Sequence, residues 1–303
     1  MSAHTYETAP ISRVTVNGVT HAYRLFGKWS KELPPLLMIN HFRSNMDHWD
    51  PLMINPLATS RQILQIDPPG TGHTKSGTVL TTFQDMADMY ANVARTIGIN
   101  QVDLIGFSIG SMQAQLLALN QPAGFVRRLI LAGSRPSGTH PGLSNADGSM
   151  RKVLQSAEGS DAEACKHAFC HTFFPLTPEK QARAAASWDR MQAAHPNRPL
   201  YLHAEGTSNL VKAIGKFINP TEERGKSYER LGHLKIPVLV ANGSKDELVP
   251  TENSYILFEK LPNARLELWP FSGHGFLDEY AESFAACVNQ FLDEDLEGLK
   301  ASL

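Results

Sequence analysis

The feature that most constrains the fold of this chain is a strand, a tight turn and a helix in direct succession over residues 102–117. The turn reads Gly-Phe-Ser-Ile-Gly, with Ser108 at its centre. Apolar residues before the turn indicate a buried strand, and apolar residues at helical spacing follow it. The turn is too tight for side chains at its two glycines, and it lifts the serine hydroxyl to the end of a sheet at a helix N-terminus. We therefore predict that Ser108 is a nucleophile.

A serine nucleophile needs a base to take its proton and a carboxylate to hold that base in the right tautomer. Asp246 follows the apolar run 236–241, in the loop expected at the carboxyl end of a strand. His274 stands between two glycines after a second short strand, residues 266–269, and before an amphipathic helix. The chain thus contains serine, acid and histidine in the order Ser108, Asp246, His274, which we predict to be a catalytic triad.

On these motifs the chain resembles the serine hydrolases of the α/β-hydrolase superfamily, over nearly its whole length. The segment 36–51 is similar to the early His-Gly loop of that family, whose two residues fall on Asn40 and His41. The resemblance implies an oxyanion hole formed by the backbone N–H groups of Phe42 and Ile109. His41 stands in place of the family's glycine, and Ser111 stands where many relatives have another glycine.

The distribution of strands and helices predicts an α/β fold, a mostly parallel sheet covered by helices on both faces. Strands are expected at 12–16, 20–26, 35–39, 62–66, 101–107, 127–132, 236–241 and 264–269, with a hairpin at Asn17-Gly18. Helices alone are expected between the strands at 127–132 and 236–241, at 147–157, 161–173, 178–193 and 206–218. By the resemblance, residues 136–233 form a helical lid inserted into an α/β-hydrolase core made of residues 1–135 and 234–303.

Four residues are candidates for substrate contacts. His41 and Arg43 lie on the loop of the expected oxyanion hole, where His41 could donate a hydrogen bond to substrate or could pack and brace the loop. Arg43 could bind an anionic group or brace the loop. Phe173 and Trp188 belong to a set of apolar side chains that could line a substrate pocket or form the core of the lid. The other members of that set are Phe169, Phe174, Met191 and Tyr201.

Two other motifs invite cofactor interpretations that their chemistry does not support. The stretch 65–76 resembles a phosphate-binding loop, but Asp67 occupies the position of a glycine and His73 that of the lysine. His167 and His171 have the spacing of zinc ligands on a helix, but no matched third ligand or intervening glutamate accompanies them. We expect neither a cofactor nor a metal.

The composition of the chain indicates which kinds of partner and which cellular location to expect. The net charge of −2 gives no electrostatic case for nucleic acid or an anionic membrane. Three cysteines without regular spacing favour a reducing compartment, and no apolar run has the length of a signal peptide core or a membrane span. The expectation is a cytoplasmic enzyme with a small-molecule substrate and no nucleic-acid or membrane partner. The sequence leaves the oligomeric state open.

Together these features predict a serine hydrolase that cleaves an ester, lactone or thioester of a small, largely apolar molecule through an acyl-enzyme. Similar folds also carry perhydrolase and non-hydrolytic chemistry on the same triad, and a slow-turnover ligand receptor would keep the same residues. These alternatives stay open at the level of sequence.

Overall fold

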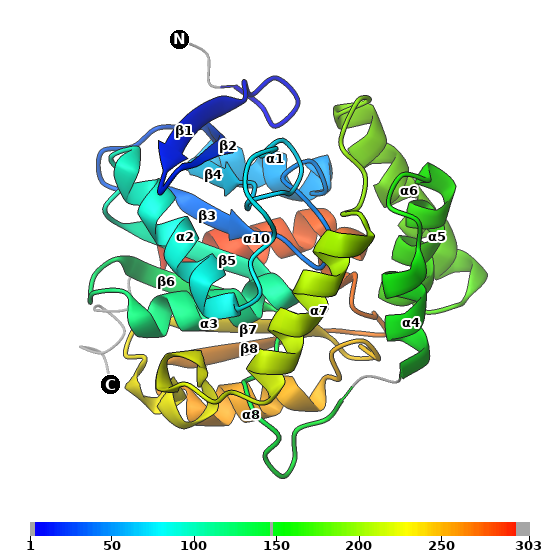
Figure 1. Ribbon diagram of the computed structural model, residues 1–303. Coiled ribbons are helices and arrows are strands. Elements are labelled where there is room, and N and C mark those ends of the chain that lie inside the picture. Colours follow the sequence, from blue (N-terminus) through cyan, green and yellow to red (C-terminus); the bar gives the residue numbers. More distant parts are fainter. Residues whose placement is uncertain (1–3, 146–147, 295–303) are drawn as a thin grey trace.

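The computed structural model describes residues 4–145 and 148–294, which form one central sheet with helices on both faces (Figure 1). The eight strands have the order β1-β2-β4-β3-β5-β6-β7-β8. β2 pairs antiparallel with β1 and with β4, and all the other pairs are parallel. The parallel strands β3, β5 and β7 are buried on both faces, as expected where helices cover a sheet on both sides.

The strands are β1 (Ser12–Val16), β2 (Val19–Gly27), β3 (Leu36–Ile39), β4 (Gln62–Ile66), β5 (Val102–Phe107), β6 (Val126–Ala132), β7 (Val238–Gly243) and β8 (Ala264–Trp269). The helices outside the insertion are α1 (Pro51–Ser60), α2 (Phe83–Thr96), α3 (Ile109–Asn120), α8 (Glu252–Lys260), α9 (Phe276–Glu279) and α10 (Ala281–Asp293). The remaining elements are α4 (Gly148–Ser156), α5 (Ala162–Phe173), α6 (Pro178–Ala194), α7 (Ala204–Ile218) and the 3-10 turns η1 (Glu223–Gly225) and η2 (Tyr228–His233).

The predicted elements are confirmed, and two helices were missed. Each expected strand is present within two residues of its predicted limits, and the hairpin turns at Asn17 and Gly18, which both have positive φ. The missed helices are α1 and α8. α1 carries recognisable signals, because Asp50 caps it by accepting the Leu52 N–H and Pro51 occupies its first turn.

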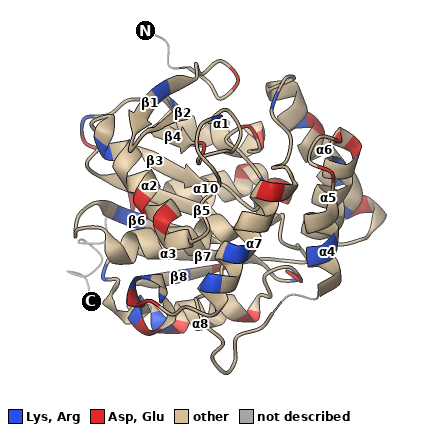
Figure 2. Ribbon diagram, viewed as in Figure 1, with Lys and Arg blue, Asp and Glu red and all other residues tan. Residues whose placement is uncertain are grey.

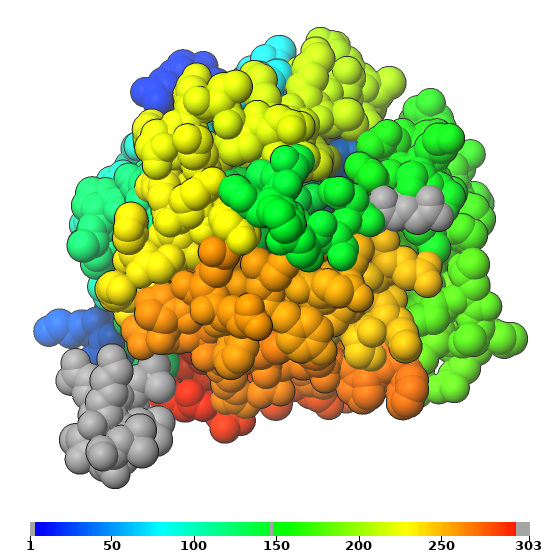
Figure 3. Space-filling view, turned by 90° about the horizontal axis from the view of Figure 1, so that it is seen from below, coloured from blue at the N-terminus to red at the C-terminus, as the bar shows by residue number. Residues whose placement is uncertain are grey.

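The helices between β6 and β7 form a layer beside the sheet, which we call the helical insertion (residues 136–233). Figure 1 shows α4, α5 and α6 stacked to one side of the sheet and α7 crossing in front of it. Residue 147, the first of the predicted helix 147–157, lies outside the described residues. From below, the segment that follows β6 lies on the surface between the end of the insertion and α8 (Figure 3).

Arg43, on the loop after β3, fastens the insertion to the sheet. Its Nε and Nη2 donate to the carbonyl of Leu202 at 3.1 and 2.7 Å, and its Nη1 donates to the carbonyl of Leu154 at 2.9 Å. The backbone carbonyl of Arg43 in turn accepts the Leu202 N–H. One buried guanidinium therefore ties α4 and the segment just before α7 to the core.

The surface carries charges of both signs on the outer helices, without a large region of one sign in the view of Figure 2. Among the residues that the structure describes, no helix has the length and apolar character needed to cross a membrane.

Candidate active site

Ser108 occupies a strained backbone position between β5 and α3. Its φ of 57° and ψ of −125° lie in a region that costs a non-glycine residue about 1–3 kcal/mol, as is common at functional sites. A Cβ on Gly106 would lie 2.3 Å from the Gly110 carbonyl oxygen. The glycine before the serine therefore lets the helix fold back against the strand, which is the steric reason anticipated for the motif.

The second glycine of the motif allows α3 to approach the loop after β3. A Cβ on Gly110 would lie 2.3 Å from the carbonyl oxygen of Ile39 and 2.5 Å from that of Asn40. This close approach brings the start of α3 next to the loop that carries Phe42. Phe42, Ser108 and Ile109 accordingly line the same cavity. As the first residue of α3, Ile109 has a backbone N–H with no acceptor inside the helix, so it is available to an oxyanion.

Asp246 and His274 form a buried pair. His274 Nδ1 lies 2.6 Å from Asp246 Oδ2, and Asp246 Oδ1 accepts the N–H groups of Leu248 and Val249 at 2.9 and 2.8 Å. Both side chains have no exposed surface. Because a carboxylate accepts, Nδ1 carries the proton, which leaves Nε2 as the basic nitrogen.

His274 is positioned beside the serine turn. Its ring stacks on Phe107, the residue before Ser108, with centroids 4.9 Å apart. A Cβ on Gly133 would lie 2.8 Å from His274 Cε1, so the absence of a side chain after β6 makes room for the imidazole. Nε2 of His274 is buried and has no hydrogen-bond partner among the described residues. Nε2 is therefore available to accept a proton from Ser108. Hydrogen bonds between catalytic groups in unliganded sites are commonly long and tighten only when substrate binds.

His41 braces the oxyanion loop. Its ring packs edge-on against Phe107 and Phe173, at 5.5 and 5.1 Å, and its Nδ1 lies 3.2 Å from the Phe42 carbonyl. Burial, aided by repulsion from His274, lowers the pKa of His41 to about 3, so the ring is neutral. A carbonyl only accepts, so the single proton sits on Nδ1 and Nε2 is an acceptor. This geometry favours the bracing role over hydrogen-bond donation to substrate.

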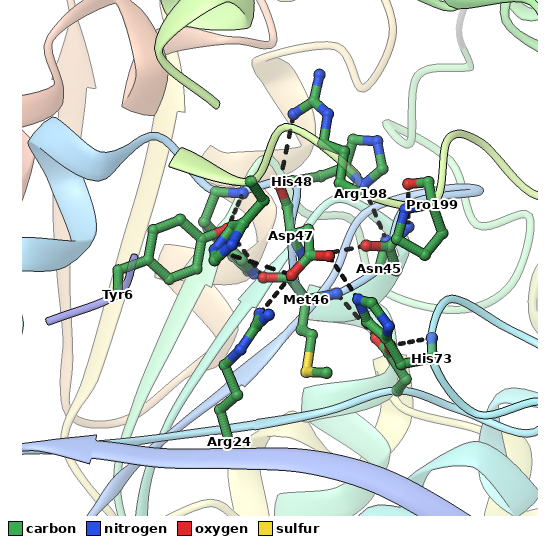
Figure 4. Close-up of polar contacts among 12 residues, drawn as sticks. Tyr6, Arg24, Asn45, Met46, Asp47, His48, His73, Arg198 and Pro199 are labelled. Carbon is green, nitrogen blue, oxygen red and sulfur yellow. Dashed lines mark hydrogen bonds and ion pairs between the residues drawn. The ribbon is translucent and has the colours of Figure 1, made fainter. Parts of the chain in front are cut away.

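The loop after β3, which carries His41 and Phe42, is also held in place by the buried carboxylate of Asp47 (Figure 4). Asp47 is hydrogen bonded to Arg24 of β2 and, at 2.6 Å, to His73 Nε2. Burial acts to raise the pKa of Asp47, but the His73 hydrogen bond and the Arg24 charge outweigh it and hold that pKa well below its usual range. Arg198 of the helical insertion donates to the Asp47 carbonyl. The loop bearing Phe42 is therefore fixed before any ligand arrives.

The glycine-rich stretch 65–76 folds around a carboxylate. Asp67 is fully buried and accepts the N–H groups of Met46 and His73 at 2.8 and 2.7 Å. Gly72 has a φ of +54°, and a Cβ there would lie 2.2 Å from Asp67 Oδ2. Within this stretch the His73 N–H is directed at the Asp67 carboxylate, and the N–H groups of Thr71 and Thr74 donate to the carbonyls of Pro68 and Thr71.

Two cavities meet the predicted triad. The first is lined by Ser108 and has a volume of about 80 Å³. This volume is small compared with the 300–1,000 Å³ typical of sites for drug-sized ligands. Its apolar walls come from α3, α4, α7 and the loop after Asp246: Met112, Leu154, Ile214, Ile218, Leu248, Val249 and Pro250. The second lies at His274 and is bordered by Phe173, Phe174, Lys245 and Glu247.

Several residues predicted to contact the substrate do not line the serine cavity. Trp188 is buried against Phe169 and Tyr201, within the helical insertion, and is not among the residues lining either cavity. Phe173 packs on His274 at 5.1 Å and borders only the second cavity. The donors of Arg43 point to insertion carbonyls. Ile214 and Ile218 line the serine cavity but were not predicted as site residues, although their spacing of four on an amphipathic helix was a usable signal.

His167 and His171 stack on α5 with centroids 5.3 Å apart. Within residues 4–145 and 148–294, no group of three or more His, Cys, Asp or Glu side chains is arranged to hold a metal ion.

Comparisons with known proteins agree with this architecture. A family model described as the alpha/beta hydrolase fold matches residues 34–281. "Putative carbamate hydrolase RutD" of Azorhizobium caulinodans is 26% identical over 246 residues, covering 80% of this chain and 84% of the relative. The pimeloyl-[acyl-carrier protein] methyl ester esterase of Nitrosomonas europaea is 24% identical over 259 residues, covering 84% and 94%.

A solved α/β-hydrolase fold protein from Chitinophaga pinensis superimposes with a TM-score of 0.82 at 29% identity, covering 96% of this chain and all of the other. The family model spans most of the chain, from before β3 to the start of α10. The chain therefore belongs to the α/β-hydrolase fold family of enzymes.

Proposed function

We propose that this protein is a serine hydrolase that cleaves an ester, lactone or thioester of a small molecule through an acyl-enzyme at Ser108. One observation carries the proposal. A serine on a strained strand-to-helix turn shares a cavity with two backbone donors, and a buried Asp246–His274 pair lies against the same turn. Such an arrangement combines a nucleophile, a base, an orienting acid and oxyanion donors.

In this mechanism His274 Nε2 accepts the hydroxyl proton as Ser108 Oγ attacks the carbonyl carbon. The N–H groups of Phe42 and Ile109 stabilise the negative oxygen, a contribution worth about 2.7–4 kcal/mol for one such donor in a related type of site. The imidazolium then protonates the leaving oxygen or sulfur. Water attacks the acyl-enzyme with His274 again as base and releases the acid.

The relatives support a reaction at an acyl carbon, since one is named a carbamate hydrolase and another a methyl ester esterase. We assign substrate choice to the helical insertion, acting as a lid. Its helices α4 and α7 supply Leu154, Ile214 and Ile218 to the cavity wall, whereas the proposed triad comes entirely from the core. The wall can therefore vary without disturbing the reacting groups.

The proposal is tested with a fluorophosphonate probe and a chromogenic short-chain ester. We expect labelling at Ser108, a burst followed by steady turnover, and loss of both in a folded Ser108→Ala variant, by up to about a millionfold in rate. Oxidation that depends on added peroxide, with little hydrolysis, would favour perhydrolase chemistry. Tight ester binding without turnover would favour a receptor, and turnover retained by Ser108→Ala would exclude the covalent mechanism.

A further inference from the structure

The loop that carries His274 rests on the helical insertion as well as on the sheet. The Gly275 N–H donates to the carbonyl of Phe173, the last residue of α5, at 2.7 Å. A Cβ on Gly273 would lie 2.8 Å from the same carbonyl oxygen. The backbone on both sides of His274 is therefore packed against the end of α5, so the position of the base depends on a segment outside the core.

Ser272, two residues before His274, joins this loop to the loop of the acid. The residue is fully buried. Its carbonyl oxygen accepts the N–H of Lys245, the neighbour of Asp246, at 2.8 Å. A Cβ on Gly243 would lie 2.4 Å from that oxygen, so the end of β7 admits the loop because residue 243 lacks a side chain. The backbone of Ser272 thus holds the loops of base and acid together.

The hydroxyl of Ser272 is held by Glu279, at the end of α9. Because a carboxylate accepts, Ser272 Oγ donates to Glu279 Oε2, at 2.7 Å. The other oxygen, Oε1, accepts Lys180 Nζ of α6 and lies 3.7 Å from Arg183 Nη1. The Glu279 side chain has no exposed surface, so its charge is stabilised by these partners rather than by water. One buried carboxylate therefore links the loop of His274 to α6.

A second ion pair joins α6 to the core further along the same helix. Positions 180, 183 and 190 are close to whole numbers of turns apart, so they share one face of α6. Arg190 donates to both oxygens of Asp50, the N-cap of α1, whose side chain has no exposed surface. Among the residues that the structure describes, the Arg190 side chain donates to Asp50 alone. Two contacts of α6 with buried carboxylates thus differ in what they hold, since only that of Lys180 leads to His274.

We propose that Glu279 is a positioning residue for the base. Through Ser272 it holds the loop of His274 between the acid loop and α6, which keeps the imidazole against Phe107, beside the serine turn. This inference rests on the proposed hydrolase function and gives the helical insertion a second part in it. Helices α5 and α6 orient the base, whereas α4 and α7 supply the cavity wall. A displacement of about 1 Å at a catalytic group can lower a rate by about a hundredfold.

Ser272→Ala is the sharpest test, because it cuts the link at the hydroxyl and leaves the ion pair of Glu279 and Lys180 in place. One readout is the rate constant of acylation in the burst with a p-nitrophenyl ester. The other is the downfield proton NMR resonance of His274 Nδ1–H, which is hydrogen bonded to Asp246. We expect acylation to slow by about tenfold to a hundredfold, with the dissociation constant of the ester unchanged. The resonance should broaden, because a loosened Nδ1 proton exchanges faster with water.

Variants of the two charged residues test the rest of the link. Lys180→Met removes the charge but keeps the apolar stem, and it should reproduce part of the effect on both readouts. Lys180→Arg, which keeps a charged donor for Glu279, should restore most of the rate. Glu279→Gln should match Ser272→Ala if it folds, since breaking a buried ion pair is strongly destabilising.

Arg190→Gln is the matched control, since it weakens a contact of the same helix with another buried carboxylate. It should lower the melting temperature and leave both readouts unchanged. If either readout in Ser272→Ala equals that of the parent, or if Arg190→Gln and Ser272→Ala alter both readouts alike, the positioning role is overturned and the hydrolase is not. If the parent neither cleaves the ester nor reacts with a fluorophosphonate, the proposed function fails. The resonance then still shows whether Ser272 and Glu279 hold His274 in place.

Discussion

The imidazole of His274 is held by one oxygen of Asp246, and the other oxygen of that carboxylate is held by two backbone N–H groups. The acid therefore has a fixed orientation before it orients the base. Because Nδ1 must donate to Asp246, the arrangement selects the tautomer in which Nε2 can accept the serine proton.

This relationship predicts that Asp246→Asn leaves the fold intact but lowers kcat by about 10⁴, the effect of the same change in a well-studied triad. The amide oxygen can still accept the N–H groups of Leu248 and Val249. The amide nitrogen, however, donates toward Nδ1 and selects the wrong tautomer of His274. Steady-state kinetics on a short-chain ester, with circular dichroism as a check of folding, measure the effect.

Asp103→Asn is the control for this prediction, since Asp103 is also fully buried but lies at the start of β5. Its carboxylate accepts Arg127 Nε and Nη2 at 2.9 and 2.6 Å and lies 3.5 Å from Arg61 Nη1. Weakening this ion pair should lower the free energy of unfolding by up to about 3–5 kcal/mol, with kcat unchanged. If Asp103→Asn reduced kcat and Asp246→Asn reduced only stability, the assignment of the acid would be wrong.

The anchoring role of Arg43 predicts that Arg43→Lys loosens the helical insertion. A lysine has a single nitrogen in place of the three that donate to the Leu154 and Leu202 carbonyls, so hydrogen bonds are lost, and each buried hydrogen bond to a charged group contributes about 1.5–3 kcal/mol. Hydrogen exchange should quicken in α4 and α7 while the strands stay protected. Unchanged exchange in both helices would contradict the anchoring role, and a direct role in substrate binding would instead raise KM without altering exchange.

Buried neutral histidines predict acid-sensitive folding. Burial lowers the pKa of His195 from 6.5 to about 4 and that of His41 to about 3. Below pH 6.5 the unfolded chain binds protons that the folded chain does not, so stability is greatest above that pH and declines as the pH falls. Each histidine contributes roughly 1.4 kcal/mol per pH unit to the slope.

His195→Gln should therefore flatten the decline of the unfolding free energy between pH 7 and pH 5, measured by urea titration. His167→Gln, a change at an exposed histidine of α5, should leave the slope as it is. A slope that is the same in the parent protein and in His195→Gln would show that His195 does not fold in its neutral form.

The cavity wall predicts which residues set the length of the acyl group. Ile214→Trp should fill space beside Ser108 and lower kcat/KM for long acyl esters by about tenfold for each methylene excluded, with a smaller effect on acetate. Trp188→Phe should lower the melting temperature without changing the ranking of esters, because Trp188 packs inside the insertion. A changed ranking in Trp188→Phe alone would assign recognition to the insertion core.

Ile214 lines the serine cavity and Trp188 does not, although only Trp188 was predicted from the sequence to contact the substrate. The elbow around Ser108 and the loops of Asp246 and His274 were predictable because local chain geometry dictates their residue types. Which helix of the insertion faces the serine depends on tertiary packing, and buried aromatic residues are enriched in a core as well as in a pocket. Gly133 carried no local signal, since its purpose is to leave room for a histidine distant in sequence.

The most direct test of the account is mass spectrometry of the protein quenched during turnover of a p-nitrophenyl ester. Acylation of Ser108 predicts a single mass increase equal to the acyl group, located by peptide mapping on the segment that contains Ser108 and absent from Ser108→Ala. The adduct should accumulate in Asp246→Asn if deacylation is slowed more than acylation. Turnover with no adduct under any quench condition, together with activity in Ser108→Ala, or an adduct on another residue, would contradict the central claim.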